Sequence, residues 1–184
     1  MLITVARTIY CASNGFCKLI LFETNFLGIV FIMGKIVAIC ISAKKGVQKK
    51  DIKRCKLLEG HGLEGDAHAG DWHRQISLLS KEGRKAMEDK GAKLDSGDFG
   101  ENLLTEGVDY SGIEVGNELR LGKEALVRVT QIGKECHDKC NIYYQVGDCI
   151  MPREGIFAEV LKGGEIKVND YIGFVNDKSS SSNN

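Results

Sequence analysis

Short apolar runs rich in β-branched residues, separated by turn residues, make up most of this sequence. Residues 35–42 (KIVAICIS) are apolar at nearly every position, which is typical of a strand buried on both faces. Further candidate strands have the same character: residues 53–58, 75–80, 113–121 and 125–130. The last two are expected to pair across a turn around Gly122 and Lys123. The pattern therefore favours β structure.

Two other local signals concern a hairpin and a helix. Near the C-terminus, GIFAEVL and EIKVNDYIGFV flank Gly163 and Gly164, which can form a two-residue turn, so we predict a hairpin. Residues 81–91 (KEGRKAMEDKG) follow Ser80, a residue type that caps helices, and end at Gly91, a suitable stop. We expect this to be the main helix.

These elements predict a mainly β fold with minor α structure. About seven short strands and one main helix indicate a small, mixed, partly closed β-barrel rather than alternating βαβ units. The length of 184 residues suits one domain, which we assign to residues 33–176. Residues 177–184 (DKSSSSNN) are polar and of low complexity, so we expect a disordered tail.

Residues 1–32 are apolar without helical or alternating order, and we treat them as an extension outside the domain. Met33 directly precedes the first predicted core strand, so a chain beginning there should be as stable as the full chain. Glu23, Thr24 and Asn25 interrupt the apolar run, leaving fewer than the roughly 20 residues that a bilayer span requires. We expect no membrane association.

Composition narrows the function further. Lysine plus arginine and aspartate plus glutamate both number 25, so no net field attracts nucleic acid. The seven cysteines include no CxxC pair, which favours free thiols in the reducing cytoplasm over a secreted disulfide framework.

Residues 136–149 contain three cysteines and a histidine, the richest run of soft ligands in the chain. Cys136 follows a predicted core strand and lies near Lys134, His137 and Lys139, whose positive charges favour a thiolate. A thiolate can act as a nucleophile, a sulfur carrier or a metal ligand. We therefore expect Cys136 to be functional.

The other cysteines have simpler interpretations. Cys40 and Cys55 lie in predicted strands and should be buried hydrophobes. Cys140 and Cys149 can be interpreted equally well as buried hydrophobes or as functional residues. Together with Cys136 and His137 they offer four zinc ligands, so a structural zinc module is an alternative. Against it, adjacent Cys136 and His137 would rarely both reach one tetrahedral ion.

A second cluster of potential metal ligands lies in the glycine-rich loop of residues 60–71 and just after it. It consists of His61, His68, His73, Asp66 and Asp71. Their spacing matches no helical ligand arrangement, so we expect these side chains to be solvated or hydrogen-bonded rather than metal-bound.

Six segments, in this order, resemble a MOSC domain, the module named after the C-terminal part of molybdenum cofactor sulfurases: GLEGDAHAG, QISLLS, SGDFGENLLTEG, LRLG, VTQIGKEC and GIFAEVLKGGEIKVND. The resemblance covers roughly residues 35–175 and implies a mixed β-barrel that uses a cysteine at the end of a strand. Cys136 matches that cysteine. Many members carry a basic residue and a proline just before it; here Lys134 keeps the cation, whereas Glu135 replaces the proline.

The resemblance also implies a cofactor site for Mo-molybdopterin, with Cys136 as the molybdenum ligand. Asp66 matches the family's GxxGD motif, and Glu101 and Asn102 match its GEN motif. Lys134 is a further candidate for cofactor binding. A pterin phosphate needs backbone N–H groups and a cation, which the glycine loop with Arg74 or Lys81 can offer. Ordinary turn chemistry explains the glycines equally well, and Asn102 can instead bridge backbone groups.

The implied function is sulfur transfer to the molybdenum cofactor or maturation of it, with a molybdenum-dependent reductase of N-hydroxylated compounds as the alternative. Both need Cys136. No pyridoxal-phosphate desulfurase region precedes the domain, so pyridoxal phosphate is not expected in this chain. A cysteine desulfurase or another donor would supply sulfur, and a molybdoenzyme or cofactor-biosynthesis protein would accept the product.

We expect Cys136 to be alkylated faster at neutral pH than Cys40 or Cys55, because both thiolate fraction and access favour it. Mass spectrometry of peptides after brief iodoacetamide treatment measures this order. Equal labelling of the three cysteines would contradict the assignment of Cys136 as the reactive thiol.

Overall fold

The computed structural model of the protein describes residues 5–11, 17–25, 28–134 and 139–176, and it describes only the backbone of residues before Gly34 and of Asn176. The strands are β1 (Val5–Cys11), β2 (Cys17–Asn25), β3 (Gly28–Ile41), β4 (Lys50–Asp51), β5 (Arg54–Leu58), β6 (Gly62–Leu63), β7 (Ile76–Ser80), β8 (Leu103–Glu106), β9 (Glu118–Leu121), β10 (Ala125–Ile132), β11 (Ile156–Lys162), β12 (Gly164–Lys167) and β13 (Tyr171–Asn176). The helices are α1 (Lys81–Asp89), α2 (Asn141–Val146) and α3 (Met151–Glu154).

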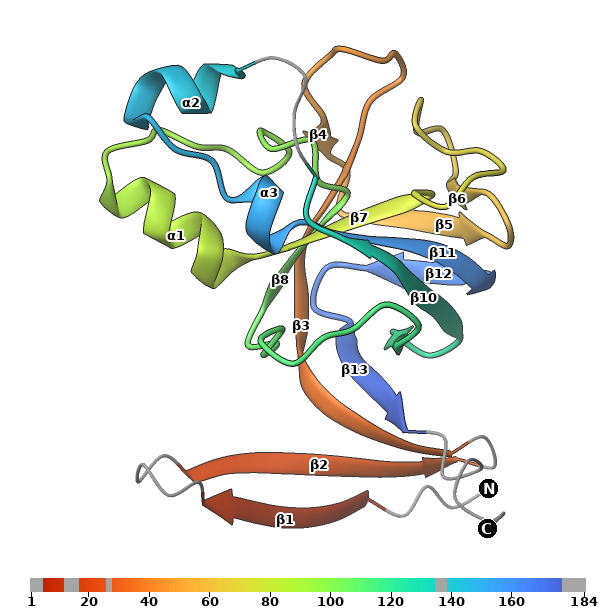
Figure 1. Cartoon of the computed structure of the whole chain (residues 1–184). Coiled ribbons are helices and arrows are strands. Elements are labelled where there is room, and N and C mark those ends of the chain that lie inside the picture. The colour runs from red at the N-terminus through yellow and green to blue at the C-terminus, as the bar shows by residue number, and fades with distance from the viewer. Residues whose placement is uncertain (1–4, 12–16, 26–27, 135–138, 177–184) are drawn as a thin grey trace, which may run out of the picture.

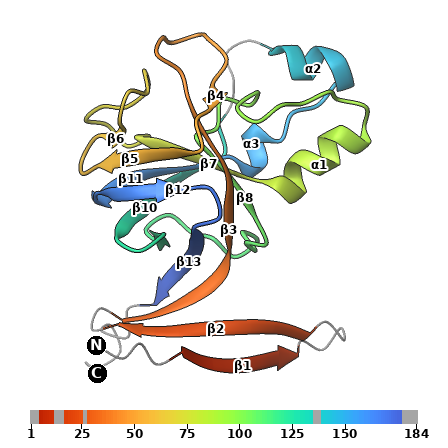
Figure 2. The ribbon, with the colours of Figure 1, turned by 180° about the vertical axis from the view of Figure 1, so that it is seen from behind.

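Seven strands form a closed barrel (Figures 1 and 2). Each strand is hydrogen-bonded to the next in the order β3, β13, β9, β10, β11, β7 and β8, and β8 pairs with β3 to complete the ring. All these pairs are antiparallel except β7 with β8, which α1 connects. The predicted mainly β, mixed barrel is therefore confirmed.

Strands on the helical side of the barrel are buried on both faces, because helices pack against their outer surface. The barrel interior holds, among others, Ile36, Ile39, Ile76, Leu78, Leu103, Ile156 and Ala158. Their neighbours on the same strands point outward into a second cluster with helix residues: Ala38, Cys40, Leu79, Leu104 and Phe157, with Met87 of α1 and Met151 of α3. This explains why residues 36–41 are apolar throughout.

The predicted helix is confirmed. The Gly83 amide of α1 donates to the Ser80 hydroxyl at 2.9 Å, which is an N-cap. The chain leaves the helix through Gly91, whose φ is +99°, a conformation that glycine adopts without strain. Within the described residues, α1 is the longest helix.

The predicted C-terminal hairpin is wrong. Strand β11 pairs with β10 on one edge and β7 on the other, so no edge of it is left for β12. Strand β12 instead pairs with β5, in a separate three-stranded sheet with β6. Gly163 makes the crossing between sheets possible, because a side chain there would press against the Leu57 carbonyl oxygen.

The strand expected at residues 113–121 is shorter than predicted, since β9 begins at Glu118. Residues 113–117 form turns instead, and Ile113 is buried in the barrel core. Ile113 is apolar because it anchors this loop to the barrel core, not because it belongs to a strand. None of the helices in the described part of the chain has the length and hydropathy needed to span a bilayer.

The N-terminal region contains strands that the sequence pattern did not indicate. Strand β3 begins at Gly28 rather than near Lys35, and β13 pairs with it from Ile29 to Lys35. Strands β1 and β2 form a hairpin that joins the rest of the sheet through β3 and lies beyond the barrel (Figure 1). The ladder with β13 thus continues past the proposed start at Met33.

We expect a chain beginning at Gly28 to keep the thermal midpoint of the full chain, because it retains the whole ladder between β3 and β13. A chain beginning at Met33 loses the partners of residues 173–176, so any loss of stability on truncation should appear only there. Differential scanning calorimetry of the three lengths measures this. A large drop for the chain beginning at Gly28 would show that β1 and β2 contribute to the core.

Candidate functional site

A pocket of about 240 Å³ opens on the outer face of the barrel, where β7 and β8 begin. We call it the cationic pocket. Four basic side chains line it together with polar and aromatic groups: Lys49, His68, Arg74, Lys134, Ser77, Asn102, Trp72, Phe99 and Phe157, with Gly46, Val47, Gly100 and Met151.

A buried ion pair forms one wall of the pocket. Lys49 Nζ lies 2.7 Å from Asp66 Oδ2, and both side chains are almost inaccessible to solvent. Burial alone would raise the pKa of Asp66, but hydrogen bonds from Lys49, the Ser42 amide and Asn102 hold it below its usual value. Asp66 therefore stays ionised, and Lys49 has a fixed counter-charge.

Asn102 connects this ion pair to the barrel. Its Nδ2 donates to Asp66 Oδ2 at 3.1 Å and to the Cys40 carbonyl of β3 at 3.0 Å. Its Oδ1 accepts from the amide and the hydroxyl of Ser77 in β7, at 3.1 and 3.0 Å. Asn102 lines the pocket, but its amide group is occupied by the protein's own groups.

Glu101 supports the turn before β8 rather than the pocket wall. Its buried carboxylate accepts from the Gly97 amide at 2.7 Å and the Phe99 amide at 3.1 Å. Burial raises the pKa of Glu101 above its usual value. The turn carries Phe99 and Gly100 into the cationic pocket, so Glu101 acts on the site indirectly.

Arg74 lies between two aromatic rings. Its guanidinium carbon is 4.8 Å from the centre of the Trp72 ring and 5.7 Å from that of Phe157. Its Nε is buried and has no hydrogen-bond partner among the described residues. A buried donor without an acceptor is costly in a folded protein, and an anion or polar ligand in the pocket would supply that acceptor.

The chain reaches Lys134 through a close backbone contact. Gly133 has φ of +72°, donates its amide to the Gly155 carbonyl at 2.7 Å, and any side chain on it would overlap the Pro152 carbonyl oxygen. The Lys134 amide then donates to the Met151 carbonyl at 3.0 Å. These contacts fix Lys134 at the pocket, two residues before Cys136.

The charges in the pocket do not cancel. Asp66 compensates Lys49, whereas no carboxylate among the described lining residues compensates Arg74 or Lys134. Burial and the nearby Lys49 lower the pKa of His68, so this ring is neutral at pH 7. The pocket is therefore suited to an anionic group.

Not every predicted site residue is brought together here. Lys81, at the start of α1, pairs with Glu106 at 2.6 Å and does not line the cationic pocket. Cys136 lies outside the described residues, so its predicted role stays a prediction. In the part of the chain that the structure describes, no three His, Cys, Asp or Glu side chains are grouped as metal ligands.

The remaining cysteines differ in their surroundings. Cys40 and Cys55 are buried, and burial raises the pKa of both thiols, that of Cys40 to about 12. Cys140 and Cys149 are half-buried. Cys140 lines a neighbouring pocket of about 510 Å³ that shares Gly46, Val47, Phe99 and Gly100 with the cationic pocket.

Two polar residues of the site were missed at the sequence level. Lys49 lies in the run KKGVQKK, where nothing distinguishes it from its solvated neighbours. Ser77 lies in a strand and looks like an ordinary polar position. Only the tertiary structure shows that Lys49 is buried against Asp66 and that Ser77 binds Asn102.

Comparisons with known proteins identify related folds. A family model described as MOSC domain matches residues 65–173, more than half of the chain. Among solved structures, the YuaD protein from Bacillus subtilis has a TM-score of 0.65 at 18% identity, covering 78% of this chain and 97% of its own. YiiM from Geobacillus stearothermophilus has a TM-score of 0.54 at 19% identity, covering 82% and 77% of the two chains. YiiM from Escherichia coli has a TM-score of 0.52 at 22% identity, covering 79% of this chain and 72% of its own. No curated protein sequence matches.

We expect Asp66→Asn to destabilise the protein by about 3–5 kcal/mol, because it leaves the Lys49 charge buried without a counter-charge. Asp71→Asn is the matched control, since Asp71 is exposed in the same loop and should change stability by less than about 0.5 kcal/mol. Urea unfolding at pH 7 compares them.

The pH dependence gives an independent check of the ion pair. The folded-state pKa of Asp66 is depressed, so its contribution is present above the unfolded value of about 4 and is lost as the pH falls through the folded pKa. The difference between wild type and Asp66→Asn should therefore shrink in acid. A constant difference would contradict an ionised Asp66.

Proposed function

The chain belongs to the MOSC domain family, and on that premise we propose that it binds the molybdenum cofactor in the cationic pocket and handles the cofactor's sulfur through Cys136. The observation that carries this proposal is the group of basic side chains at the pocket, where the buried Nε of Arg74 has no acceptor among the described residues. A molybdopterin carries an anionic phosphate, which matches this need.

The size of the pocket defines which part of the cofactor it suits. Pockets for whole ligands of this kind enclose roughly 300–1000 Å³, and the cationic pocket has about 240 Å³. It therefore suits one end of the molecule, the phosphate or the pterin ring. Arg74 and Lys134 would bind the phosphate, and the exposed part of the Trp72 ring offers an apolar surface beside it.

Cys136 has a suitable position along the chain for the other end of the cofactor. It comes two residues after Lys134, which lines the cationic pocket, and four before Cys140, which lines the adjoining one. Two residues of extended backbone span at most about 7 Å. When bound, the cofactor would supply a molybdenum centre that accepts soft sulfur ligands, and the thiolate of Cys136 is such a ligand.

The sulfur-handling step is a thiol–persulfide exchange. The Cys136 thiolate attacks the outer sulfur of a donor persulfide, the bond between the two donor sulfurs breaks, and the donor leaves as a thiolate. The sulfur is then held as a persulfide on Cys136, with no external oxidant or reductant consumed. A cysteine desulfurase is the natural donor, a molybdoenzyme or cofactor-biosynthesis protein the acceptor, and the reducing cytoplasm the compartment that keeps Cys136 free.

We expect Cys136→Ser to lose both the persulfide and co-purifying molybdenum, while its circular dichroism stays unchanged. Serine keeps the size of the side chain but removes the soft ligand and the nucleophile together. The protein is purified from a host that makes the cofactor and analysed for metals, for pterin and, after incubation with a cysteine desulfurase and cysteine, for persulfide.

Cys140→Ser and Cys149→Ser are the matched controls, and each should keep the fold and at least part of the cofactor binding. Stoichiometric zinc in the wild type, lost together with stability in either control, would favour the structural zinc module instead. Wild-type cofactor binding and sulfur transfer in Cys136→Ser would disprove the proposed role of Cys136.

A further inference from the structure

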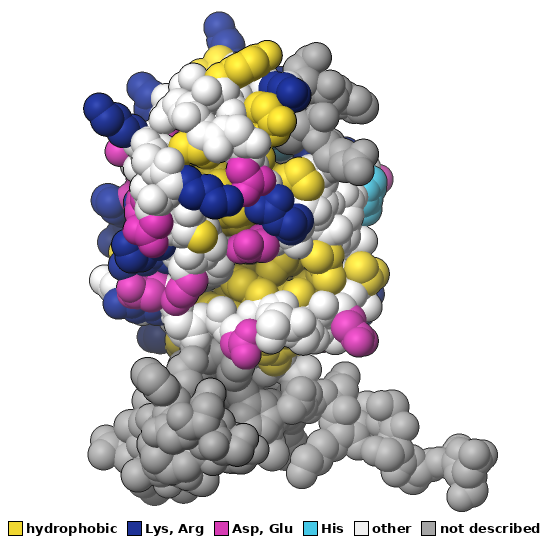
Figure 3. All heavy atoms as spheres, turned by 60° about the vertical axis from the view of Figure 1, so that its left-hand side comes forward, with side chains coloured by type: hydrophobic (Ala, Val, Ile, Leu, Met, Phe, Trp, Pro, Cys, Tyr) yellow, Lys and Arg dark blue, Asp and Glu magenta, His cyan; other side chains and the backbone are white. Residues whose placement is uncertain are grey.

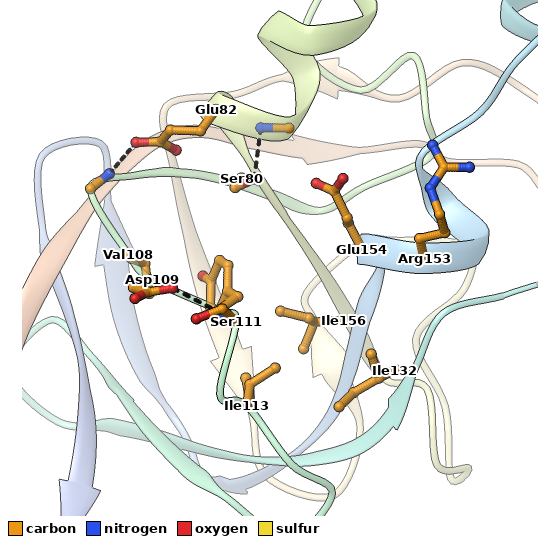
Figure 4. A pocket seen from close by; sticks show the side chains of 13 residues that line it. Ser80, Glu82, Val108, Asp109, Ser111, Ile113, Ile132, Arg153, Glu154 and Ile156 are labelled. Carbon is orange, nitrogen blue, oxygen red and sulfur yellow. Dashed lines mark hydrogen bonds between the residues drawn. The ribbon is translucent and has the colours of Figure 1, made fainter.

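A second and larger pocket, of about 670 Å³, lies at the end of the barrel where β7, β8 and β10 stop and β11 begins (Figure 4). We call it the acidic pocket. The loop after β8, the first turn of α1 and the end of α3 surround it. The mouths of β-barrels are common places for ligands, because the barrel core is exposed there.

The floor of the acidic pocket is apolar. Ile113 and Ile156 belong to the barrel core, and Ile132 at the end of β10 is 39% exposed. The hydroxyl of Tyr110 is 2.9 Å from Thr105 Oγ1, so this polar end is already satisfied and the ring contributes an aromatic surface. Figure 3, which turns the side of α1 forward, shows apolar side chains exposed between acidic ones.

The rim of the pocket is negatively charged. Glu82, Asp109 and Glu154 carry carboxylates at its edge (Figure 4). The single basic residue among the lining residues, Arg153, donates from both terminal nitrogens to Asp148, at 3.0 and 3.2 Å. Its charge is thus directed away from the pocket.

We propose that the acidic pocket binds a small organic cation, a protonated amine attached to an apolar or aromatic body. The apolar body would bury the exposed face of Ile132 and contact the ring of Tyr110, and the ammonium group would lie among Glu82, Asp109 and Glu154. Cations also bind favourably to aromatic faces. The one basic side chain among the described lining residues, that of Arg153, is already paired with Asp148, so this lining does not favour an anion. A fully polar ligand would leave the apolar floor uncovered.

This inference does not depend on the proposed cofactor function. Ser77 and Asn102, at the starts of β7 and β8, line the cationic pocket, whereas Ser80 and Gly107, at the ends of the same strands, line the acidic one. The described residues that line the two pockets do not overlap. Loss of molybdenum binding would therefore leave the acidic pocket as it is.

The test uses the full chain with labelled isoleucine methyl groups and two probes of equal shape, 2-phenylethylamine, which is protonated at pH 7, and 2-phenylethanol, which is neutral. Titration with the amine should shift the methyl signals of Ile113, Ile132 and Ile156. The alcohol should bind at least about fivefold more weakly, as expected when a cation loses interactions with several exposed carboxylates.

Glu154→Gln and Asp109→Asn should each weaken binding of the amine by about two- to fivefold. Both keep the shape of the side chain, and asparagine retains the oxygen that accepts from the Ser111 amide. Glu59→Gln, at an exposed glutamate outside the pocket, makes the same change in net charge and should leave the affinity within twofold. Equal affinity for amine and alcohol, unchanged affinity in both pocket variants, or no shift of these methyl signals would overturn the proposal.

Discussion

The buried ion pair between Lys49 and Asp66 is the interaction on which the cationic pocket depends. A charge removed from water needs a close counter-charge and hydrogen bonds for its remaining atoms. The Asp66 carboxylate is the counter-charge of the Lys49 ammonium, and it also accepts hydrogen bonds from the Ser42 amide and the Asn102 side chain. The segment after β3, the glycine-rich loop and the turn before β8 therefore meet at one carboxylate, and the walls of the pocket are held in place together.

The parallel pairing of β7 with β8 separates two surfaces of opposite charge. Because both strands run in the same direction, their starts lie together and their ends lie together. The starts adjoin Lys49 and Arg74, and the ends adjoin Glu82 and Asp109. A chain with equal numbers of acidic and basic residues thus carries a local charge difference along one pair of strands.

The elements that could be predicted from the sequence are those with local causes. The Ser80 cap, the Gly91 stop and the apolar run of residues 35–42 each act within a few residues, and the helix and the core strand are found there. The prediction of a C-terminal hairpin was wrong because strand pairing depends on which strand edges are already occupied. Strands β7 and β10 occupy both edges of β11. No turn signal at Gly163 contains that information.

The candidate site shows the same difference between features with local causes and features that depend on distant residues. Motif resemblance indicated Asp66, Glu101 and Asn102, which are all buried, and basic character indicated Arg74 and Lys134, which line the pocket. The sequence could not distinguish side chains that face a ligand from those that stabilise a loop. Glu101 is of the second kind, because its carboxylate accepts from the Gly97 and Phe99 amides. Lys49 was missed because burial of a lysine is decided by its distant partner. Lys81 pairs with Glu106, 25 residues further along the chain, and does not line the cationic pocket.

The strand order also determines when the protein can become complete during synthesis. Among the described residues, β13 is the last strand, and it fills the gap between β3, near the beginning, and β9. Until residue 176 has left the ribosome, β3 and β9 each present an unpaired edge, and the barrel interior has an open side. Contacts between such distant segments form slowly, because a long loop must close before they stabilise anything. The growing chain therefore passes through a stage with exposed strand edges, in which pairing with other chains competes with its own closure.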